Sequence, residues 1–299
     1  VGGFPCQDFS VAGKRKGFNS MRTHDGKLRA DDLPTEETRG KLYYWMKEVI
    51  DITKPKIFIA ENVKGLVNMG QVKDIIQADF SQADGNGYIV LSPQVLHAGN
   101  YGVPESRERV IFIGIRKDAL KEEIAQILKN DLIPNHLNPY PQPTHNCTLN
   151  DETLATPVVL CDVLKQLKEP KESFDPSQRF YSKAKYMGAH CQGQKEITMN
   201  SIGPTIRSEH HGNIEYRRLS LEHGGTNKNE LEKGLAERRL TPRECALIQT
   251  FPPDFQFVIP KDYDWKRFIV SASGAYKVIG NAVPPILAYH IAMRIQNLW

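Results

Sequence analysis

The sequence predicts an α/β fold with a largely parallel sheet, and three observations lead to this. Helical and strand patterns alternate along residues 40–117. A short apolar strand, residues 57–60, runs directly into Glu61-Asn62-Val63. Helical patterns return after residue 239, beyond a long irregular stretch. Strands that alternate with helices favour a parallel sheet, and such sheets bind ligands at the carboxyl ends of their strands.

The predicted elements follow in chain order. Glycine and proline make residues 1–18 a loop. Apolar residues at helical spacing predict helices in residues 40–53, 72–80 and 120–128, and apolar runs predict strands in residues 57–60, 88–96 and 110–115. Thr241-Pro242-Arg243-Glu244 is a capping box that predicts a helix start, and residues 283–298 form an amphipathic C-terminal helix.

The change of character along the chain predicts an inserted domain. Residues 1–117 and 239–299 have α/β patterns, whereas residues 118–238 are polar, irregular and rich in turns. We therefore expect one α/β domain built from the two outer segments, with a smaller domain inserted between them.

Composition narrows the class of protein only slightly. The 299 residues carry a formal net charge of +4, which is compatible with a nucleic-acid partner but weak evidence for one. Five cysteines without C-x-x-C spacing argue against a disulfide framework and match no common zinc site, so we expect a reducing cytoplasm and no metal. No apolar run is long enough for a membrane span.

Several residues could carry chemistry, and each has a plainer alternative. Cys6 lies in a glycine-rich loop near Lys14 and Arg15, where positive charge would favour a nucleophilic thiolate, but most free cysteines are core residues. Glu61 after its strand could act as an acid or hold a ring nitrogen, or simply be solvated. Arg107 and Arg109 could bind carbonyls or phosphates, or form an exposed salt-bridged edge.

Taken together and in order, these blocks resemble the DNA cytosine-5 methyltransferase family. The matching blocks are Gly3-Phe4-Pro5-Cys6-Gln7-Asp8-Phe9-Ser10, Arg39-Gly40-Lys41-Leu42, Glu61-Asn62-Val63, Asn100-Tyr101-Gly102-Val103-Pro104 with Arg107 and Arg109, Arg239-Leu240-Thr241-Pro242-Arg243-Glu244 through Phe251-Pro252, and Gly280-Asn281-Ala282-Val283. The resemblance covers residues 1–117 and 239–299, and it makes residues 118–238 the variable target-recognition domain. It implies a Rossmann-like sheet of the kind that binds S-adenosylmethionine.

The resemblance also implies a mechanism. The Cys6 thiolate would attack C6 of cytosine, Glu61 would bind N3 and the exocyclic amine, and Arg109 would bind O2. Arg107 would position the loop or a phosphate, and Asn62 would shape the pocket. S-adenosylmethionine would be the methyl donor. Its expected contacts are Pro5, Leu42, Asn281, Ala282 and Val283.

The implied substrate is double-stranded DNA with the target cytosine flipped out. Residues 201–218 concentrate polar and basic side chains around turns, which could read base edges or form a solvated loop. The expected DNA contacts are Gln7, Ser10, Lys14, Arg15, Arg207, His210, Asn213, Arg217 and Arg218. We expect a monomeric, nucleoid-associated cytoplasmic enzyme that belongs to a restriction-modification system with a cognate endonuclease.

Two departures from the family pattern stand out. Glu105 occupies a position where many members have glutamine, and the family's first glycine-rich block does not precede Cys6. We therefore expect that the sheet lacks its first strands and that the 299-residue chain alone binds S-adenosylmethionine poorly. The alternatives are a non-catalytic DNA-binding module, one half of a split enzyme, or a methyltransferase that acts on tRNA.

Overall fold

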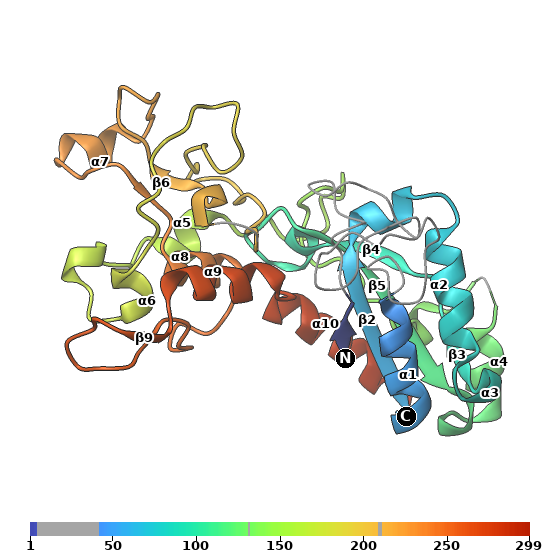
Figure 1. Ribbon diagram of the computed structural model, residues 1–299. Helices are drawn as coiled ribbons and strands as arrows, with labels where there is room; N and C mark the ends of the chain where they lie inside the picture. The colour runs from blue at the N-terminus through green and yellow to red at the C-terminus, as the bar shows by residue number, and fades with distance from the viewer. Residues whose placement is uncertain (5–41, 131, 209–210) are drawn as a thin grey trace. The chain divides into compact units, whose positions relative to one another are not determined.

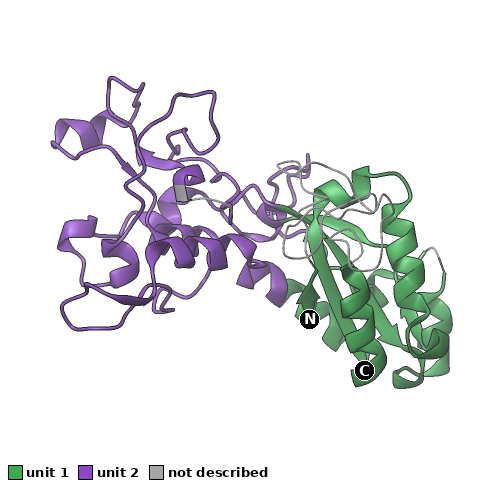
Figure 2. Ribbon diagram, viewed as in Figure 1, with its two compact units in different colours: residues 1–97, 108–142, 290–299 green, residues 98–107, 143–289 purple. Residues whose placement is uncertain are grey.

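A computed structural model describes residues 1–4, 42–130, 132–208 and 211–299 (Figure 1). The chain forms two compact units (Figure 2). Unit 1 comprises residues 1–97, 108–142 and 290–299, and unit 2 comprises residues 98–107 and 143–289. Among the described residues, no helix is long and apolar enough to span a bilayer.

Unit 1 is built on a five-stranded sheet. Its strands are β1 (Gly2–Gly3), β2 (Ile57–Val63), β3 (Tyr88–Val90), β4 (Gln94–His97) and β5 (Glu108–Arg116). Strand β1 pairs with β2 in parallel, whereas β2, β3 and β4 each pair antiparallel with β5. Among the described strands of this sheet, β1 to β4 therefore share one direction and β5 is reversed. The α/β class is confirmed, and the sheet is mixed although most of its strands run in parallel.

Two predicted strand boundaries differ in the structure. Glu61, Asn62 and Val63 lie within β2 and not after it, because this strand stays paired with β5 as far as Val63 and Arg109. The strand predicted at residues 88–96 is divided into β3 and β4. The break includes Pro93, which has no N–H to donate to a ladder.

The core of unit 1 is largely aromatic. The helices around the sheet are α1 (Tyr43–Thr53), α2 (Val72–Ser81), α3 (Ala83–Asn86) and α4 (Glu122–Leu128), with the 3₁₀ turns η3 (Lys64–Asn68), η5 (Lys117–Ala119) and η6 (Asn135–Leu137). The ring centroids of Phe4, Tyr43 and Phe112 lie 6.3, 6.1 and 6.0 Å from that of Phe80. Gly114 makes room for a further ring, because a Cβ there would lie 2.1 Å from the Phe58 side chain.

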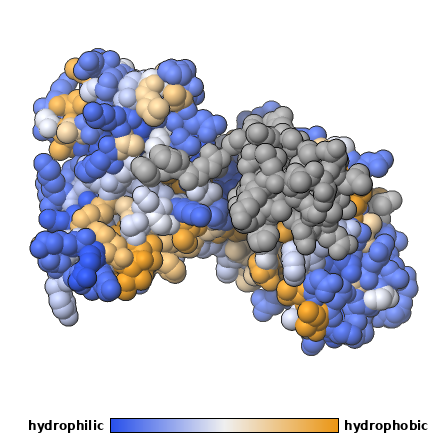
Figure 3. All heavy atoms as spheres, viewed as in Figure 1, coloured by the Kyte–Doolittle hydropathy of each residue, from blue (hydrophilic) through white to orange (hydrophobic). Residues whose placement is uncertain are grey.

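One side of α1 remains at the surface. Trp45, Val49 and Ile52 are 66%, 56% and 76% exposed, although Tyr43 and Ile50 of the same helix are buried. The predicted apolar stripe of this helix is therefore only partly covered within unit 1. Figure 3 shows hydrophobic residues at the surface of unit 1 in this view, next to hydrophilic ones.

Unit 2 consists of short elements around a second core. These are α5 (Leu160–Leu164), α6 (Pro176–Arg179), β6 (Tyr216–Arg218), α7 (Lys228–Glu232), β7 (Arg238–Arg239), α8 (Pro242–Ile248), β8 (Ile259–Pro260), β9 (Phe268–Val270) and α9 (Ala272–Asn281), with η4 (Ala98–Tyr101), η7 (Pro170–Glu172) and η8 (His211–Asn213). Helix α10 (Pro285–Gln296) contributes residues to both units. The capping box at Thr241 is confirmed, since its side chain accepts from the Glu244 amide and the Glu244 carboxylate accepts from the Thr241 amide.

The limits of the units differ from the predicted domain limits. Residues 118–142 pack in unit 1, and residues 239–289 pack in unit 2. The reason is the second hydrophobic core, in which Ala246 of α8 and Ile279 of α9 pack with Leu160 and Ile206. A helix whose apolar face completes the core of the irregular region belongs to that region physically.

Candidate active site

Glu61 and Arg109 form an ion pair on unit 1. Arg109 of β5 faces Val63 of β2, so Glu61 lies diagonally across the ladder on the same side of the sheet. Arg109 Nε lies 2.7 Å from Glu61 Oε1, and the side chains are only 12% and 14% exposed. The pair is thus oriented and mostly shielded from water, which strengthens its electrostatic effect on a bound group.

The end of β1 lies directly beside Glu61. Gly3 pairs with Glu61 in the parallel ladder, and a Cβ at Gly3 would lie 3.2 Å from Glu61 Oε2. The buried Asn62 side chain donates to the Phe4 carbonyl at 3.0 Å and accepts from the Val63 amide at 2.9 Å. Asn62 therefore joins the end of β1 to β2, just before the Pro5-Cys6 segment of the sequence.

Seven of the predicted site residues lie outside the described part of the chain. They are Pro5, Cys6, Gln7, Ser10, Lys14, Arg15 and His210.

The phosphate-binding role predicted for Arg107 does not fit its surroundings. Its guanidinium is fully buried in unit 2 and donates to the carbonyls of Ile206 (3.2 Å), Gly280 (2.9 Å) and Ala282 (2.7 Å). A group with no exposed surface cannot bind a DNA phosphate. Arg107 instead holds the backbone of the Gly280-Asn281-Ala282-Val283 block, which was the predicted cofactor contact.

Glu105 belongs to the same buried cluster, which sequence reasoning missed. Its Oε1 accepts from the Ile206 amide at 2.7 Å and lies 3.5 Å from Arg107 Nη1. A glutamine could accept the same hydrogen bond, but only a carboxylate also balances the charge of a buried guanidinium. The glutamate at position 105, where many family members have glutamine, is therefore explained by its contact with Arg107.

The predicted cofactor residues fall into two groups. Leu42 in unit 1 lines a cavity of about 430 Å³ with Phe4, Met46, Phe58 and other residues of β1, α1 and β2. The second group, Asn281, Ala282 and Val283, lies in unit 2 at the end of α9, where Asn281 is exposed.

The residues predicted to contact DNA differ from one another in how exposed their side chains are. Asn213 is partly exposed in η8, and Arg207 is 30% exposed with its Nη1 3.1 Å from Glu215. Arg217 and Arg218, by contrast, are buried in β6. The prediction that these two arginines contact bases is corrected, because their guanidinium groups are bound inside unit 2.

Arg217 and Arg218 take part in a buried ion-pair network. Arg218 lies 2.5 Å from both Glu169 and Glu230, and Arg217 lies 2.8 Å from Glu230. The network extends through Arg238, which bridges Glu169 at 3.1 Å and Glu244 at 2.8 Å. These charges hold together the short elements of unit 2 that carry them, from β6 to α8.

The network predicts an acid-sensitive fold. Burial alone would raise the pKa of Glu169, but hydrogen bonds from Arg218 and Arg238 outweigh it and lower the pKa to about 2. A lowered pKa stabilises the fold above the ordinary value of about 4.5, and this stability is lost as the pH falls from there towards 2. We expect Glu169→Gln to lower the free energy of unfolding at pH 7 by about 2–3 kcal/mol and to flatten its decrease below pH 4.5.

Urea unfolding followed by circular dichroism between pH 7 and pH 3 measures this effect. Glu172→Gln is the matched control, because Glu172 lies three residues away in η7 and is exposed. Equal pH profiles for Glu169→Gln and the unsubstituted chain would contradict the assigned role of Glu169.

The sequence of this chain was compared with protein-family models and with known proteins. The sequence model of the family described as C-5 cytosine-specific DNA methylase matches residues 1–297. Type II methyltransferase M.FnuDI from Fusobacterium nucleatum is 30% identical over 99% of this chain and 76% of its own length. Type II methyltransferase M.HpaII from Haemophilus parainfluenzae is also 30% identical, over 99% of this chain and 72% of its own length.

A solved structure shows the same fold. The methyltransferase EhMeth from Entamoeba histolytica aligns with a TM-score of 0.52 at 15% identity, covering 100% of this chain and 77% of that one. The family match extends over nearly the whole sequence and contains the ordered blocks around Glu61, Arg109 and Gly280. The chain therefore belongs to the C-5 cytosine-specific DNA methylase family.

Proposed function

We propose that this chain, a DNA cytosine-5 methyltransferase of the restriction-modification type, acts through a covalent bond between Cys6 and a flipped-out cytosine. The observation that carries the proposal is the Glu61–Arg109 pair at 2.7 Å, next to the end of β1. A carboxyl and a guanidinium held side by side match the edge of cytosine, which offers N3, an exocyclic amine and O2. Cys6 follows Phe4 by only two residues in the sequence, and Asn62 ties the Phe4 carbonyl to β2.

The chemistry assigns one task to each residue. The Cys6 thiolate adds to C6 and makes C5 nucleophilic. Glu61 accepts from the exocyclic amine and, when protonated, donates to N3, while Arg109 donates to O2 as negative charge develops in the ring. C5 then takes up the methyl group, and loss of the C5 proton restores the C5–C6 double bond and expels the thiolate. Inside a duplex C6 cannot be reached, so the base must leave the stack.

The proposed cofactor is S-adenosylmethionine, which when bound supplies an electrophilic methyl group. The cavity beside Leu42 has the size of a small-molecule site and is lined mainly by apolar residues, so it suits an adenine ring. Among the residues that the structure describes, the lining includes no carboxylate to bind a ribose. Leu42 would thus hold the apolar part of the cofactor, and contacts from Asn281, Ala282 and Val283 remain a prediction.

The substrate that we propose is double-stranded DNA with a specific target sequence. M.FnuDI and M.HpaII are Type II methyltransferases, which supports a pairing of this chain with a cognate restriction endonuclease. We propose that the enzyme acts as a monomer on DNA in the cytoplasm.

A methylation assay tests the proposed function. Duplex plasmid DNA is incubated with S-adenosylmethionine and a chain in which the family's first glycine-rich block precedes these 299 residues, and methylated positions are then mapped by bisulfite sequencing. We expect protected cytosines within one recurring sequence. Methyl groups on adenine or on the cytosine amine, detected by mass spectrometry of nucleosides, would overturn the proposal.

A further inference from the structure

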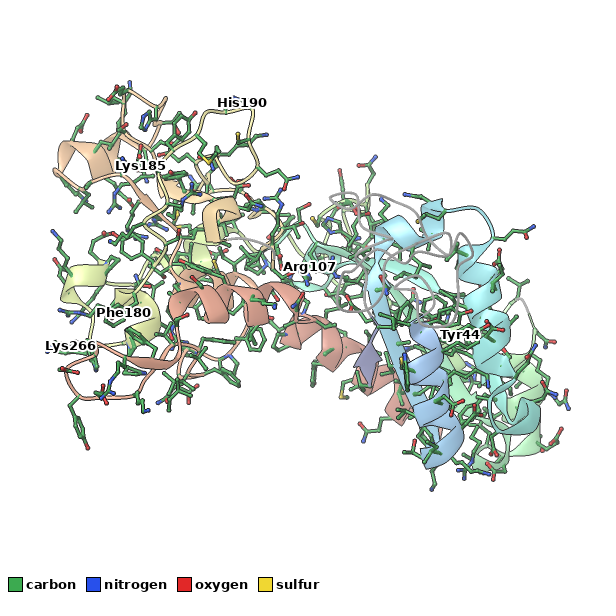
Figure 4. All side chains as sticks on the ribbon, in the orientation of Figure 1. Tyr44, Arg107, Phe180, Lys185, His190 and Lys266 are labelled. Carbon is green, nitrogen blue, oxygen red and sulfur yellow. The ribbon has the colours of Figure 1, made fainter. Side chains whose placement is uncertain are left out.

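Unit 2 carries an exposed, positively charged loop whose sequence matches none of the family blocks. Its exposed side chains include Lys183, Lys185, Met187, His190 and Gln192. Residues 176–195 contain no aspartate or glutamate. Figure 4 shows His190 at the outer end of this loop, and Figure 3 shows that this upper part of unit 2 is mostly hydrophilic.

One buried arginine holds both ends of the loop. The guanidinium of Arg239 is 1% exposed, and it donates to the carbonyls of Ala184 (3.0 Å) and Lys185 (3.2 Å) at one end. It donates to the carbonyl of Gly193 (2.8 Å) at the other end, and to that of Ile214 on the neighbouring chain segment. Because one rigid group binds both ends, the two ends of the loop are held at fixed positions within unit 2.

The turn itself is also supported from within. The Gln194 side chain accepts from the Met187 amide at 3.0 Å and donates to the Gly212 carbonyl at 3.2 Å. Gly188 and Gly193 have φ angles of +98° and +70°, which other residues rarely adopt. A Cβ at Gly193 would lie 2.3 Å from the backbone of Asn213, so glycine is also required for space.

The aromatic residue at the base of the loop faces inward. The Tyr186 ring stacks on His223 with the ring centroids 4.3 Å apart, and His223 Nδ1 lies 2.6 Å from Glu237. The base of the loop is therefore packed, while the side chains of His190 at the outer end and of Lys185 and Gln192 near the two held ends are exposed to solvent.

We propose that residues 185–192 form the loop that reads the DNA target, with His190 and Gln192 on base edges and Lys185 on a phosphate. Histidine and glutamine offer hydrogen bonds that distinguish bases, and lysine binds the backbone of any sequence. Support at both ends limits the entropy that such a loop loses on binding. The inference rests on the proposed function. It assigns base reading to exposed side chains of this loop instead of Arg217 and Arg218, whose guanidinium groups are held in ion pairs with Glu169 and Glu230.

Selection from a randomised pool of duplex DNA tests this loop. Bound duplexes are sequenced for the unsubstituted chain and for His190→Ala, Gln192→Ala and Lys185→Ala. Matched controls are His136→Ala, Gln256→Ala and Lys266→Ala, which change exposed residues elsewhere. Figure 4 shows Lys266 on a different part of unit 2 from Lys185. Because all six side chains are exposed, the melting temperatures should stay close to that of the unsubstituted chain.

The expected results separate base contacts from phosphate contacts. His190→Ala or Gln192→Ala should relax the selected sequence at one or two positions and weaken binding to it by about 5- to 100-fold. Lys185→Ala should weaken binding to all sequences and reduce the salt dependence by about one phosphate contact. Unchanged selection by both His190→Ala and Gln192→Ala, or equal losses in the controls, overturns the inference alone. If the unsubstituted chain selects no sequence, the proposed function fails together with the inference.

Discussion

Replacing Cys6 with serine is expected to abolish methyl transfer while DNA binding remains intact. A serine hydroxyl is far less ionised than a thiol near neutral pH and is a poorer nucleophile towards C6. DNA containing 5-fluorocytosine should form a covalent adduct with the unsubstituted protein, since fluorine at C5 cannot leave as a proton does. The adduct is measured as a band of reduced mobility in a denaturing gel, and it should be absent for Cys6→Ser.

The other cysteines provide the control for this experiment. Burial raises the pKa of the Cys147 thiol, and it raises the pKa of Cys245 well above the usual value, so both are disfavoured as thiolates. Cys147→Ser should therefore form the adduct in normal yield. An adduct of undiminished yield from Cys6→Ser would show that another residue is the nucleophile.

Replacing Glu61 with glutamine is expected to lower kcat by about 100- to 1,000-fold, the cost of losing one preorganised group that stabilises developing charge. Glutamine keeps the size of the side chain but can neither protonate N3 nor form an ion pair with Arg109. The effect should appear mainly in kcat, because the interaction strengthens as the ring becomes anionic. Single-turnover methylation with saturating DNA and cofactor measures it.

Glu108 offers a closely matched control. It lies on β5 and forms its own ion pair, with Lys64 Nζ 2.7 Å from Glu108 Oε1, the same length as the Glu61–Arg109 contact. This pair is much more exposed, and exposed pairs contribute about 0–1 kcal/mol. Glu108→Gln should thus leave kcat nearly unchanged. Equal losses in the two variants would mean that Glu61 acts only through the stability of the sheet.

The family and most elements of unit 1 could be predicted from the sequence. Helices α1 and α2 follow from helical periodicity, strand β2 follows from a short apolar run, and the capping box at Thr241 is a short-range signal. The direction of β5 could not be predicted in this way, because an apolar run reads the same for either direction of pairing.

Other features depend on residues far apart in the chain. Arg218 was a plausible base reader on charge alone, but its partner Glu169 lies 49 residues away. Arg107 binds carbonyls 173 and 175 residues further along, which no local pattern reveals. For the same reason the loop of residues 185–192 was missed: its support comes from Arg239, and its tip has neither periodicity nor a motif.

Arg239 holds its neighbours through main-chain oxygen atoms, and this has an evolutionary consequence. The carbonyls of Ala184, Lys185 and Gly193 would remain in place if side chains between them changed. Substitutions at the tip can therefore accumulate without loss of the support beneath it, provided that Gly188 and Gly193 are kept. A lineage could acquire a new methylation target by exchanging a few surface residues, while its folding stability and its chemical machinery stay as they were.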